Sequence, residues 1–546
     1  MSRQFRSCSL DQTYLLPPSP RDWLPQNHLA HFIGDLASEL DLTAIRDDYG
    51  RKDNRGLTAY HPELMVRLLL YAYATGQPSS RKIEQATYTD LAFRYLSANQ
   101  HPDHDTIAHF RRRHLRALAQ LFLQVLRLCH AAGMVKLGNV AIDGTKVKAN
   151  ASRRRSVSYE RLCESEKRWQ KTVEELLKQA ELADQTEAQQ PVDELPAQLA
   201  YAETRLEAIR FAKSSLAAKA QQDLREAEKA AQLLKRPIGR PLKGKESNEL
   251  RRIKGAKARK TRQRKRREAQ HPTTSHNFVD PDSQLMRDGA TGAIVQAYNA
   301  QAAVDGEAQV IVACDITDEA NDTQQLAPML RQVEANLAQR PACTTADTGY
   351  WDTVGIAELE AAGHWLLIPP ERISDQPLPP TATRNSVATT MRERLKTDQG
   401  KELYGRRGCI VEPVFGRTKQ CRGFRQFALR GKPQVRAEWA LICCTHNLLK
   451  LFACRAQAKS ASPAPRRLPW TPLRPFSRLR TRFPPSPHLF AHHALPPPPS
   501  PQLSNSLILR TSKFLLRQTE RLGHFLQQIK AGQAVKVLVV ANPGVV

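Results

Sequence analysis

The stretch Tyr404–Lys419 reads YGRRGCIVEPVFGRTK and combines aromatic, basic and acidic side chains on one short segment. Glu412 and Lys419 are seven residues apart, which is two turns of a helix, so a carboxylate and an ammonium would share one face. Pro413 suits the first position of a helix, because its missing N–H would have no partner there anyway, and this places Glu412 at the helix start. An acidic ligand beside cations suits a metal-bound phosphodiester. An amphipathic helix with solvated charges would show the same spacing.

The composition bounds the class of partner. The chain has 546 residues, with 82 Lys and Arg against 54 Asp and Glu, a formal net charge of +28 and a pI near 9.9. Such an excess favours a polyanion, because each neutralised phosphate releases counterions. DNA or RNA comes first and an acidic membrane surface second. The ten cysteines show no C-x-x-C pair and no His/Cys ligand spacing, which indicates a reducing compartment rather than a disulfide framework or a zinc site.

No targeting or membrane segment is apparent in the sequence. The N-terminus is polar and basic and has no apolar stretch of the signal-peptide type. The longest apolar run, Leu441–Cys454, is interrupted by polar residues and is too short to span a bilayer. We therefore expect a soluble, cytoplasmic protein with no membrane partner.

Apolar residues recur at three and four spacing between residues 22 and 135, which predicts an all-α domain over residues 1–135. Asp105 and Thr106 form a candidate N-cap pair for one helix that continues through IAHFRRRHLRALAQLFLQVLRLC. The His and Asp residues between His101 and Asp105 fit a turn and a helix cap better than a metal site, since their spacing matches no standard ligand set. A basic patch on this helix suits either phosphate contacts or a solvated face; it comprises Arg111, Arg112, Arg113 and Arg116.

Residues 137–152, LGNVAIDGTKVKANAS, change to a short β run that contains Asp143. A turn with two lysines, Lys146 and Lys148, is expected directly after it. A carboxylate in the middle of an apolar strand is costly to bury unless it binds a cation or is otherwise paired. Asp143 is therefore a candidate site residue on this ground alone.

The segment of residues 153–270 begins with a region that predicts two long helices. The region between residues 159 and 236 is rich in Ala, Glu, Lys, Gln and Leu and is divided by Pro191 and Pro196. A seam of roughly heptad period in the second helix predicts a helical hairpin. The seam comprises Leu199, Ala202, Leu206, Ile209, Leu216 and Ala220.

The segment of residues 153–270 ends in a strongly basic stretch. From Arg251 to Arg267, eleven of seventeen residues are Lys or Arg, which is typical of a disordered tether or a nucleic-acid arm. The tripeptide at 239–241, Gly-Arg-Pro, weakly resembles a minor-groove hook, which makes Arg240 a candidate DNA contact.

Strand patterns return after residue 271. β-type runs at 292–305, 309–318, 343–352 and 364–370, with helical segments at 321–339 and 353–363, predict an α/β layer with a mixed sheet. Asp347 falls at the C-terminal end of the third run, near which ligands gather in open α/β sheets. Three other acids are expected to be ordinary acids near strand ends: Asp315, Asp318 and Asp352.

The tail, residues 455–546, differs from the rest. It has thirteen prolines between Pro463 and Pro501 and no acidic residue before Glu520. This composition predicts a disordered basic segment rather than a packed fold. Our hypothesis is that the tail is a translated extension without a specific function.

From about Leu15 to Leu451 the chain resembles bacterial insertion-sequence transposases of the DDE type. It is most similar to those with a long helical insertion after the first catalytic strand. The resemblance rests on blocks in a fixed order: HPDHDTIAHFRRRH, AIDGTKVKANAS, NFVDPDSQLM, YNAQAAVD, NDTQQLAPML, ADTGY, VEPVFGRTKQCRGFRQFALRG and THNLLKL.

The resemblance implies an α/β, RNase H-like catalytic domain in residues 136–152 and 271–454, with a mixed sheet flanked by helices. Asp143, Asp347 and Glu412 would hold two divalent ions and catalyse strand cleavage at the element's ends and strand transfer into target DNA. Mg²⁺ suits these oxygen ligands, and Mn²⁺ should substitute. The residues expected to contact DNA phosphates are Tyr404, Arg407, Lys419, Lys146 and Lys148.

The resemblance also implies partners. The N-terminal helical domain, around residues 79–116, would recognise the terminal inverted repeats of double-stranded DNA. A homodimer would hold two ends in the synaptic complex, and the protein would be bacterial, cytoplasmic and nucleoid-associated.

Two departures from the family pattern leave alternatives open. Four residues separate Arg407 from Glu412 where the pattern has three, and Gly408 stands where it favours a basic residue. The unusual tail and Gly408 keep a second hypothesis open, a catalytically inactive remnant that only binds DNA ends. A third is an RNase H-like nuclease without strand transfer.

Overall fold

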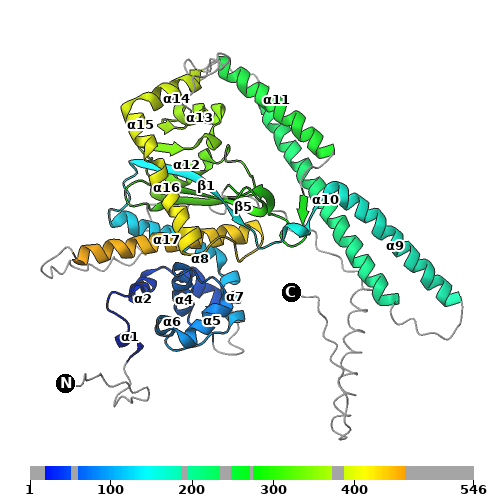
Figure 1. The fold of residues 1–546 in the computed structure, drawn as a ribbon, viewed down its shortest axis with the longest axis horizontal. Helices are drawn as coiled ribbons and strands as arrows, with labels where there is room; N and C mark the ends of the chain where they lie inside the picture. Colours follow the sequence, from blue (N-terminus) through cyan, green and yellow to red (C-terminus); the bar gives the residue numbers. More distant parts are fainter. Residues whose placement is uncertain are drawn as a thin grey trace, which may run out of the picture. The chain divides into compact units, whose positions relative to one another are not determined.

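A computed structural model describes residues 19–50, 59–185, 195–233, 248–270, 275–289, 291–371 and 386–460 (Figure 1). Arg240 and residues 461–546 of the tail lie outside these ranges.

The N-terminal part is all helical, as predicted. Asp103, and not Asp105 with Thr106, caps the helix that follows it, because its side chain accepts the backbone N–H of Thr106 at 2.8 Å. The single long helix expected here is two helices, with a break at the buried His114. The helices are α1 (Pro20–Trp23), α2 (Leu29–Glu39), α3 (Thr43–Gly50), α4 (Pro62–Ala74), α5 (Ser80–Thr89), α6 (Leu91–Leu96), α7 (His104–Arg113) and α8 (Leu115–Ala131).

A mixed sheet forms the centre of the α/β part, as predicted. The strands are β1 (Asn139–Lys148), β4 (Gln284–Arg287), β5 (Ile294–Asp305), β6 (Ile311–Thr317), β7 (Cys343–Ala346) and β8 (Leu366–Leu367). Their order is β4-β5-β1-β7-β8, and β6 also pairs with β5. β5 runs antiparallel to β1, β4 and β6, whereas β7 runs parallel to both β1 and β8.

The turn expected after Asp143 does not form. β1 continues through Gly144 to Lys148, because each residue from Val140 to Lys148 pairs in register with β5. The two lysines therefore lie on the strand itself.

Helices surround this sheet (Figure 1). They are α12 (Leu326–Leu337), α13 (Thr353–Ala361), α14 (Ser386–Lys396), α15 (Asp398–Gly405), α16 (Arg407–Gly416) and α17 (Lys432–Ser460). Two further short elements matter for the site: the 3-10 turn η2 (Thr348–Tyr350) and the π-helical turn η3 (Arg417–Cys421). α17 continues past residue 455, where the tail was expected to begin.

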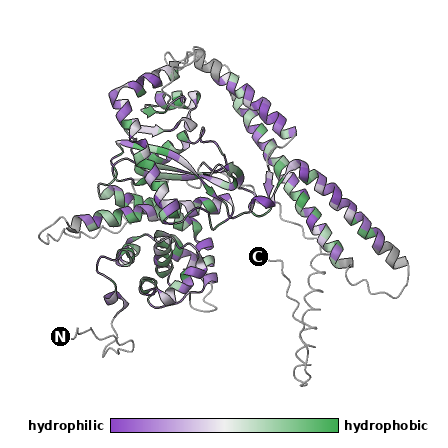
Figure 2. Ribbon diagram, in the orientation of Figure 1, coloured by the Kyte–Doolittle hydropathy of each residue, from purple (hydrophilic) through white to green (hydrophobic). Residues whose placement is uncertain are grey.

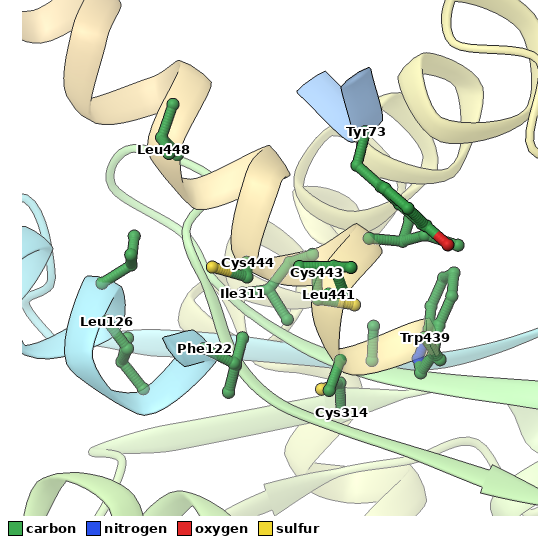
Figure 3. Close-up of a cluster of buried hydrophobic side chains, with 14 of the residues drawn as sticks. Tyr73, Phe122, Leu126, Ile311, Cys314, Trp439, Leu441, Cys443, Cys444 and Leu448 are labelled. Carbon is green, nitrogen blue, oxygen red and sulfur yellow. The ribbon is translucent and has the colours of Figure 1, made fainter. Parts of the chain in front are cut away.

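The core joins the N-terminal helices to the sheet. α17 packs against α8 and β6, and Phe122, Ile311 and Leu441 meet in this layer (Figure 3). Tyr73 on α4 reaches the buried Glu438 on α17, with 3.3 Å between the phenol oxygen and Oε1. The N-terminal helices therefore share one continuous core with the α/β part.

The insertion after β1 contains the predicted helical hairpin. It comprises the 3-10 turn η1 (Arg153–Arg155), β2 (Ser156–Ser158), α9 (Tyr159–Gln185), α10 (Leu195–Leu233) and α11 (Asn248–Gln270). β3 (Ser275–Asn277) follows the insertion and pairs with β2. The heptad seam of α10 is buried from Ala202 to Ala220, whereas Leu199 is half-buried.

The basic segment is not a disordered tether, because its residues form the helix α11. Its lysines find carboxylates on neighbouring elements: Lys265 pairs with Asp223 on α10, and Lys254 pairs with Glu358 on α13. These tertiary ion pairs offset part of the charge repulsion that would otherwise oppose helix formation.

Within the part of the chain that the structure describes, no helix combines the length and the apolar character needed to cross a membrane.

Candidate active site

Asp143 and Asp347, 204 residues apart in the sequence, are brought to equivalent positions on neighbouring strands. The parallel register of β1 and β7 pairs Ile142 with Ala346, so each aspartate is the next residue on its own chain. Neighbouring strands lie about 4.8 Å apart, and residues at equivalent positions point to the same face. The sheet therefore places the two predicted carboxylates side by side.

The surroundings of Asp143 disfavour its negative charge. Burial raises the pKa of Asp143 to about 6, and the nearby carboxylate of Asp347 adds to the rise. The backbone N–H of Gly144, which donates to Oδ1 at 2.8 Å, and the Arg407 guanidinium act in the opposite direction. Two acids that repel each other in a partly buried position form a site whose charge a cation would stabilise.

Asp347 terminates β7 and caps the next turn. Its Oδ1 accepts the backbone N–H of Gly349 at 2.9 Å, which fixes the side chain at the start of η2. Burial raises the pKa of Asp347, Arg407 opposes that rise, and Asp322 adds to it.

Arg407 and Tyr404 complete one side of this group. The Nη1 atom of Arg407 lies 3.4 Å from Oδ2 of Asp143, and its guanidinium lies 6.0 Å from the centroid of the Tyr404 ring. Burial raises the pKa of Tyr404, and Arg407 opposes the rise. Both residues were predicted to contact phosphate, and the structure places both next to the aspartate pair.

Asp322 is a member of the site that sequence reasoning did not single out. It lies in the loop between β6 and α12, and its Oδ1 accepts the side-chain amides of Asn299 and Gln301, each at 2.6 Å. The Lys146 ammonium lies 3.8 Å from its Oδ2. The available signal was its block, NDTQQLAPML, which contains an acid directly before a helix.

Gly144 allows this network to lie close to β1. A Cβ atom at this position would be 2.4 Å from Nε2 of Gln301 and 2.6 Å from Oδ1 of Asp322, which is closer than real contacts allow. The hydroxyl of Tyr350, just after Asp347, donates to Oε1 of Gln301. The network therefore connects β1, β5, the Asp322 loop and η2 around the two aspartates.

The two predicted strand lysines lie in different environments. Lys146 belongs to the Asp322 network, and burial lowers its pKa. Lys148 has an exposed side chain, and its backbone bonds to Arg425 and Phe427. The structure thus groups only Lys146 with the aspartates.

Glu412 does not lie at a helix start, which corrects the sequence interpretation. α16 begins at Arg407, so Glu412 and Pro413 lie in its interior. The missing N–H of Pro413 would have bonded to the carbonyl of Cys409, and the side-chain amide of Gln309 donates to that carbonyl instead, at 2.8 Å. This replacement allows the helix to continue through a proline.

The side chain of Glu412 is exposed and extends toward Gly408, where a Cβ atom would lie 3.1 Å from its Oε1. Lys419 lies in the π-helical turn η3, so the seven-residue spacing does not correspond to two α-helical turns. Its ammonium donates to the backbone carbonyl of Lys146 at 2.7 Å.

The four arginines of the N-terminal basic patch do not form one surface. Arg111 is buried, and its guanidinium donates to the carbonyl of Pro78 and the hydroxyl of Tyr73. Arg113 pairs with Asp48, whereas Arg112 and Arg116 are exposed. Consecutive residues on a helix point about 100° apart, which explains the separation.

The other acids near strand ends are paired with cations, as ordinary acids of this kind would be. Asp315 pairs with Arg436 at 2.6 Å, and Asp352 caps α13. Burial alone would raise the pKa of Asp318, but Lys432 and Lys219 lower it overall.

The donor set fits a hard divalent cation only in part. Asp143 and Asp347 supply the oxygen ligands that such ions prefer, and their mutual repulsion favours a cation between them. Among the described side chains, however, no group of three or more His, Cys, Asp or Glu is arranged to hold a metal ion, and Glu412 is not grouped with the two aspartates.

Comparison with known families gives two matches. Residues 18–113 match the family Transposase domain (DUF772), and residues 378–452 match the family Transposase DDE domain. Searches of curated proteins and of solved structures found no match. The second match covers Tyr404, Arg407, Glu412 and Lys419, while the aspartate pair lies outside both. These two transposase domains, at the two ends of the resemblance in sequence, support the identification of the chain as an insertion-sequence DDE transposase.

Proposed function

We propose that the protein cuts DNA at the ends of its element and joins the freed 3′-ends to target DNA, with Asp143, Asp347 and Glu412 as the catalytic carboxylates. The observation that carries the proposal is the meeting of Asp143 and Asp347 at adjacent positions of β1 and β7, beside Arg407. Ligands of α/β sheets gather at such strand ends.

The sheet supports an RNase H-like catalytic domain. The sheet strands follow one another in the chain as β1, β4, β5, β6, β7 and β8, so β7 is the fifth of them, and the fourth when the four-residue β4 at the edge of β5 is set aside. The resemblance expects Asp143 on the first strand and Asp347 at the end of the fourth; the place of Asp143 on β1, and of Asp347 directly after β7 with β4 set aside, supports the proposal.

Each residue of the group has a role that follows from its contacts. Asp143 and Asp347 would be the first two ligands of divalent ions, Mg²⁺ or Mn²⁺, which supply an activated water or 3′-hydroxyl and stabilise the leaving oxygen. Arg407, held over the Tyr404 ring, is placed to bind a phosphate oxygen through its planar guanidinium. The Asp322 network fixes Lys146 and the β1 backbone.

Glu412 is the third proposed ligand. Its support is its position within the match to the DDE domain. The structure gives no further support, since it does not group Glu412 with the aspartates. This separation favours the second hypothesis, a remnant that binds DNA ends without cutting them. Synapsis of two ends would require a dimer on DNA.

The test is cleavage of a labelled duplex that carries the element's own ends, with Mg²⁺. We expect wild type to cut at the end, and Asp143→Asn, Asp347→Asn and Glu412→Gln to lose cutting while retaining DNA binding. Asp315→Asn is the control for an acid near a strand end outside the site. Joining of a 3′-end to target DNA separates a transposase from a nuclease.

Binding without cutting by wild type would contradict the proposal and favour the inactive remnant. Normal cutting by Glu412→Gln, with loss in both aspartate variants, would remove Glu412 alone from the catalytic set.

A further inference from the structure

α11 has two faces with different charge environments. The face toward the protein is anchored by three ion pairs: Lys254 to Glu358 at 2.7 Å, Lys257 to Asp352 at 2.5 Å and Lys265 to Asp223 at 2.7 Å. Glu358 and Asp352 belong to α13 and its cap, so these contacts fix α11 to the helix that follows Asp347 and η2.

The opposite face carries cations without matching acids. We name as the α11 ridge five exposed residues: Arg259, Lys260, Arg262, Arg266 and Arg267. The segment 251–267 contains no Asp or Glu, and no ion pair among the described residues joins a ridge side chain to a carboxylate. Figure 2 shows α11 as a largely hydrophilic helix.

Repulsion among the like charges of the ridge lowers the stability of the helix, whereas a solvated face with both signs of charge avoids this loss. Like charges three or four residues apart destabilise a helix, and the ridge contains such pairs, among them Arg262 with Arg266. Ordinary solvated helices carry both signs of charge. α9 is an example, since its basic residues Lys167, Arg168 and Lys171 lie between Glu164 and the pair Glu174 and Glu175. A polyanion would relieve the repulsion on the ridge.

The charge spacing fits a nucleic-acid duplex. From Arg259 to Arg267 a helix rises about 12 Å, and duplex DNA presents one phosphate per ~1.7 Å of its axis. A membrane surface is a poorer fit, because the ridge has no Trp, Phe or Leu to insert between lipids.

We propose that the α11 ridge binds the phosphate backbone of duplex DNA and so holds the substrate on the α13 side of the aspartate pair. The proposal rests on the proposed function in that it takes DNA as the substrate. It adds a contact surface outside both family matches, since residues 259–267 lie in neither.

The test compares two fourfold variants with the same loss of charge. The ridge variant is Arg259→Gln, Lys260→Gln, Arg266→Gln and Arg267→Gln. The control on α9 is Lys167→Gln, Arg168→Gln, Lys171→Gln and Lys178→Gln, all exposed positions. Fluorescence anisotropy with a labelled duplex of unrelated sequence, in EDTA, gives the binding constant of the full chain over a salt series.

We expect the slope of log K against log salt to fall by about 3 to 4 in the ridge variant, because each lost phosphate contact removes ~0.9. The control should keep a slope near that of wild type. Circular dichroism should show that α11 is retained, since removing like charges does not destabilise a helix.

Equal slopes in the two variants would overturn the proposal, as would a larger effect on duplex RNA of the same sequence than on DNA. Because EDTA excludes cutting, this result is independent of the aspartate test. If the ridge variant shows the reduced salt slope but Asp143→Asn cuts DNA normally, the proposed catalytic function is rejected and the α11 ridge remains a DNA-binding surface.

Discussion

The aspartate pair and the Glu412 segment are positioned by different kinds of structure. Asp143 and Asp347 meet because β1 and β7 are hydrogen-bonded neighbours in a fixed register. Glu412 lies on α16, whose Cys409 carbonyl takes its donor from the side chain of Gln309, and a π-helical turn follows the helix. A strand register brings residues together over any sequence distance. On a helix, one extra residue turns the next side chain by about 100°.

Sequence position is a reliable guide to the placement of residues at strand ends and a poor guide across an irregular helix. Neighbouring parallel strands end at the same edge of a sheet. Two acids at the ends of such strands therefore lie close together, whatever the length of the segment that connects them. A spacing of seven on a helix has meaning only if every intervening turn is α-helical, and here Lys419 lies in a π turn. Substitutions in the aspartate network and in α16 should separate these two kinds of placement.

Asp143→Asn should stabilise the metal-free protein above pH 6. The pKa of Asp143 is raised from 3.8 to about 6 in the folded state. Its favourable contribution is therefore present below pH 3.8 and is lost as the pH rises through about 6. The shift corresponds to at most about 3 kcal/mol of unfolding free energy at neutral pH. Denaturant unfolding in EDTA at pH 5 and pH 8 measures it.

The matched control for this variant is Asp318→Asn. The pKa of Asp318 is lowered, so its contribution is present above the unfolded pKa and is lost as the pH falls. Asp318→Asn should destabilise the protein at pH 8. Destabilisation of Asp143→Asn at pH 8 by a similar amount would show that Asp143 is a stabilising ion-pair partner and not half of a repelling pair.

Gly144→Ala should cost about 1 to 3 kcal/mol of stability, because its Cβ would overlap Gln301 and Asp322. The rate of metal-dependent cutting should fall as well, since the same network holds Lys146. Gly138→Ala is the control, because nothing lies within 4 Å of a Cβ there. Thermal unfolding and cutting rates are the measurements, and wild-type behaviour of Gly144→Ala would show that the network is not rigid.

Gln309→Ala should cost about 0.5 to 1 kcal/mol in wild type, because the carbonyl of Cys409 loses its donor. In a Pro413→Ala background the restored backbone N–H can serve that carbonyl, so the same substitution should cost less. The double-mutant cycle isolates this coupling from the contact of Gln309 with Lys450. A coupling near zero would mean that α16 does not depend on Gln309 to accommodate its proline.

The sequence was a good guide where one local pattern decides the outcome. The strands around Asp143 and Asp347 followed from apolar β-type runs, and the α10 seam followed from its heptad period. The burial of Arg111 beside exposed Arg112 could also have been predicted, because consecutive helical residues face different directions.

The remaining features depend on contacts between distant segments. Pro413 lies inside α16 because Gln309, about a hundred residues earlier, supplies the missing donor. The lysines of α11 find acids on α10 and α13, which offset part of the charge repulsion along this helix. Asp322 joins the site because β5 presents Asn299 and Gln301 on the same face. None of these pairings leaves a signal in local spacing.

If Asp143 and Asp347 bind the metal ions for DNA cutting, replacing either ligand should change which metal supports cutting. In Asp143→Cys and Asp347→Cys the hard oxygen ligand becomes a thiolate, which binds Mg²⁺ poorly and softer ions better. We predict that both variants fail to cut a duplex carrying the element's ends with Mg²⁺ and regain cutting with Mn²⁺ or Cd²⁺. Asp315→Cys should cut like wild type in every metal. Full cutting by Asp143→Cys and Asp347→Cys with Mg²⁺ would contradict the account.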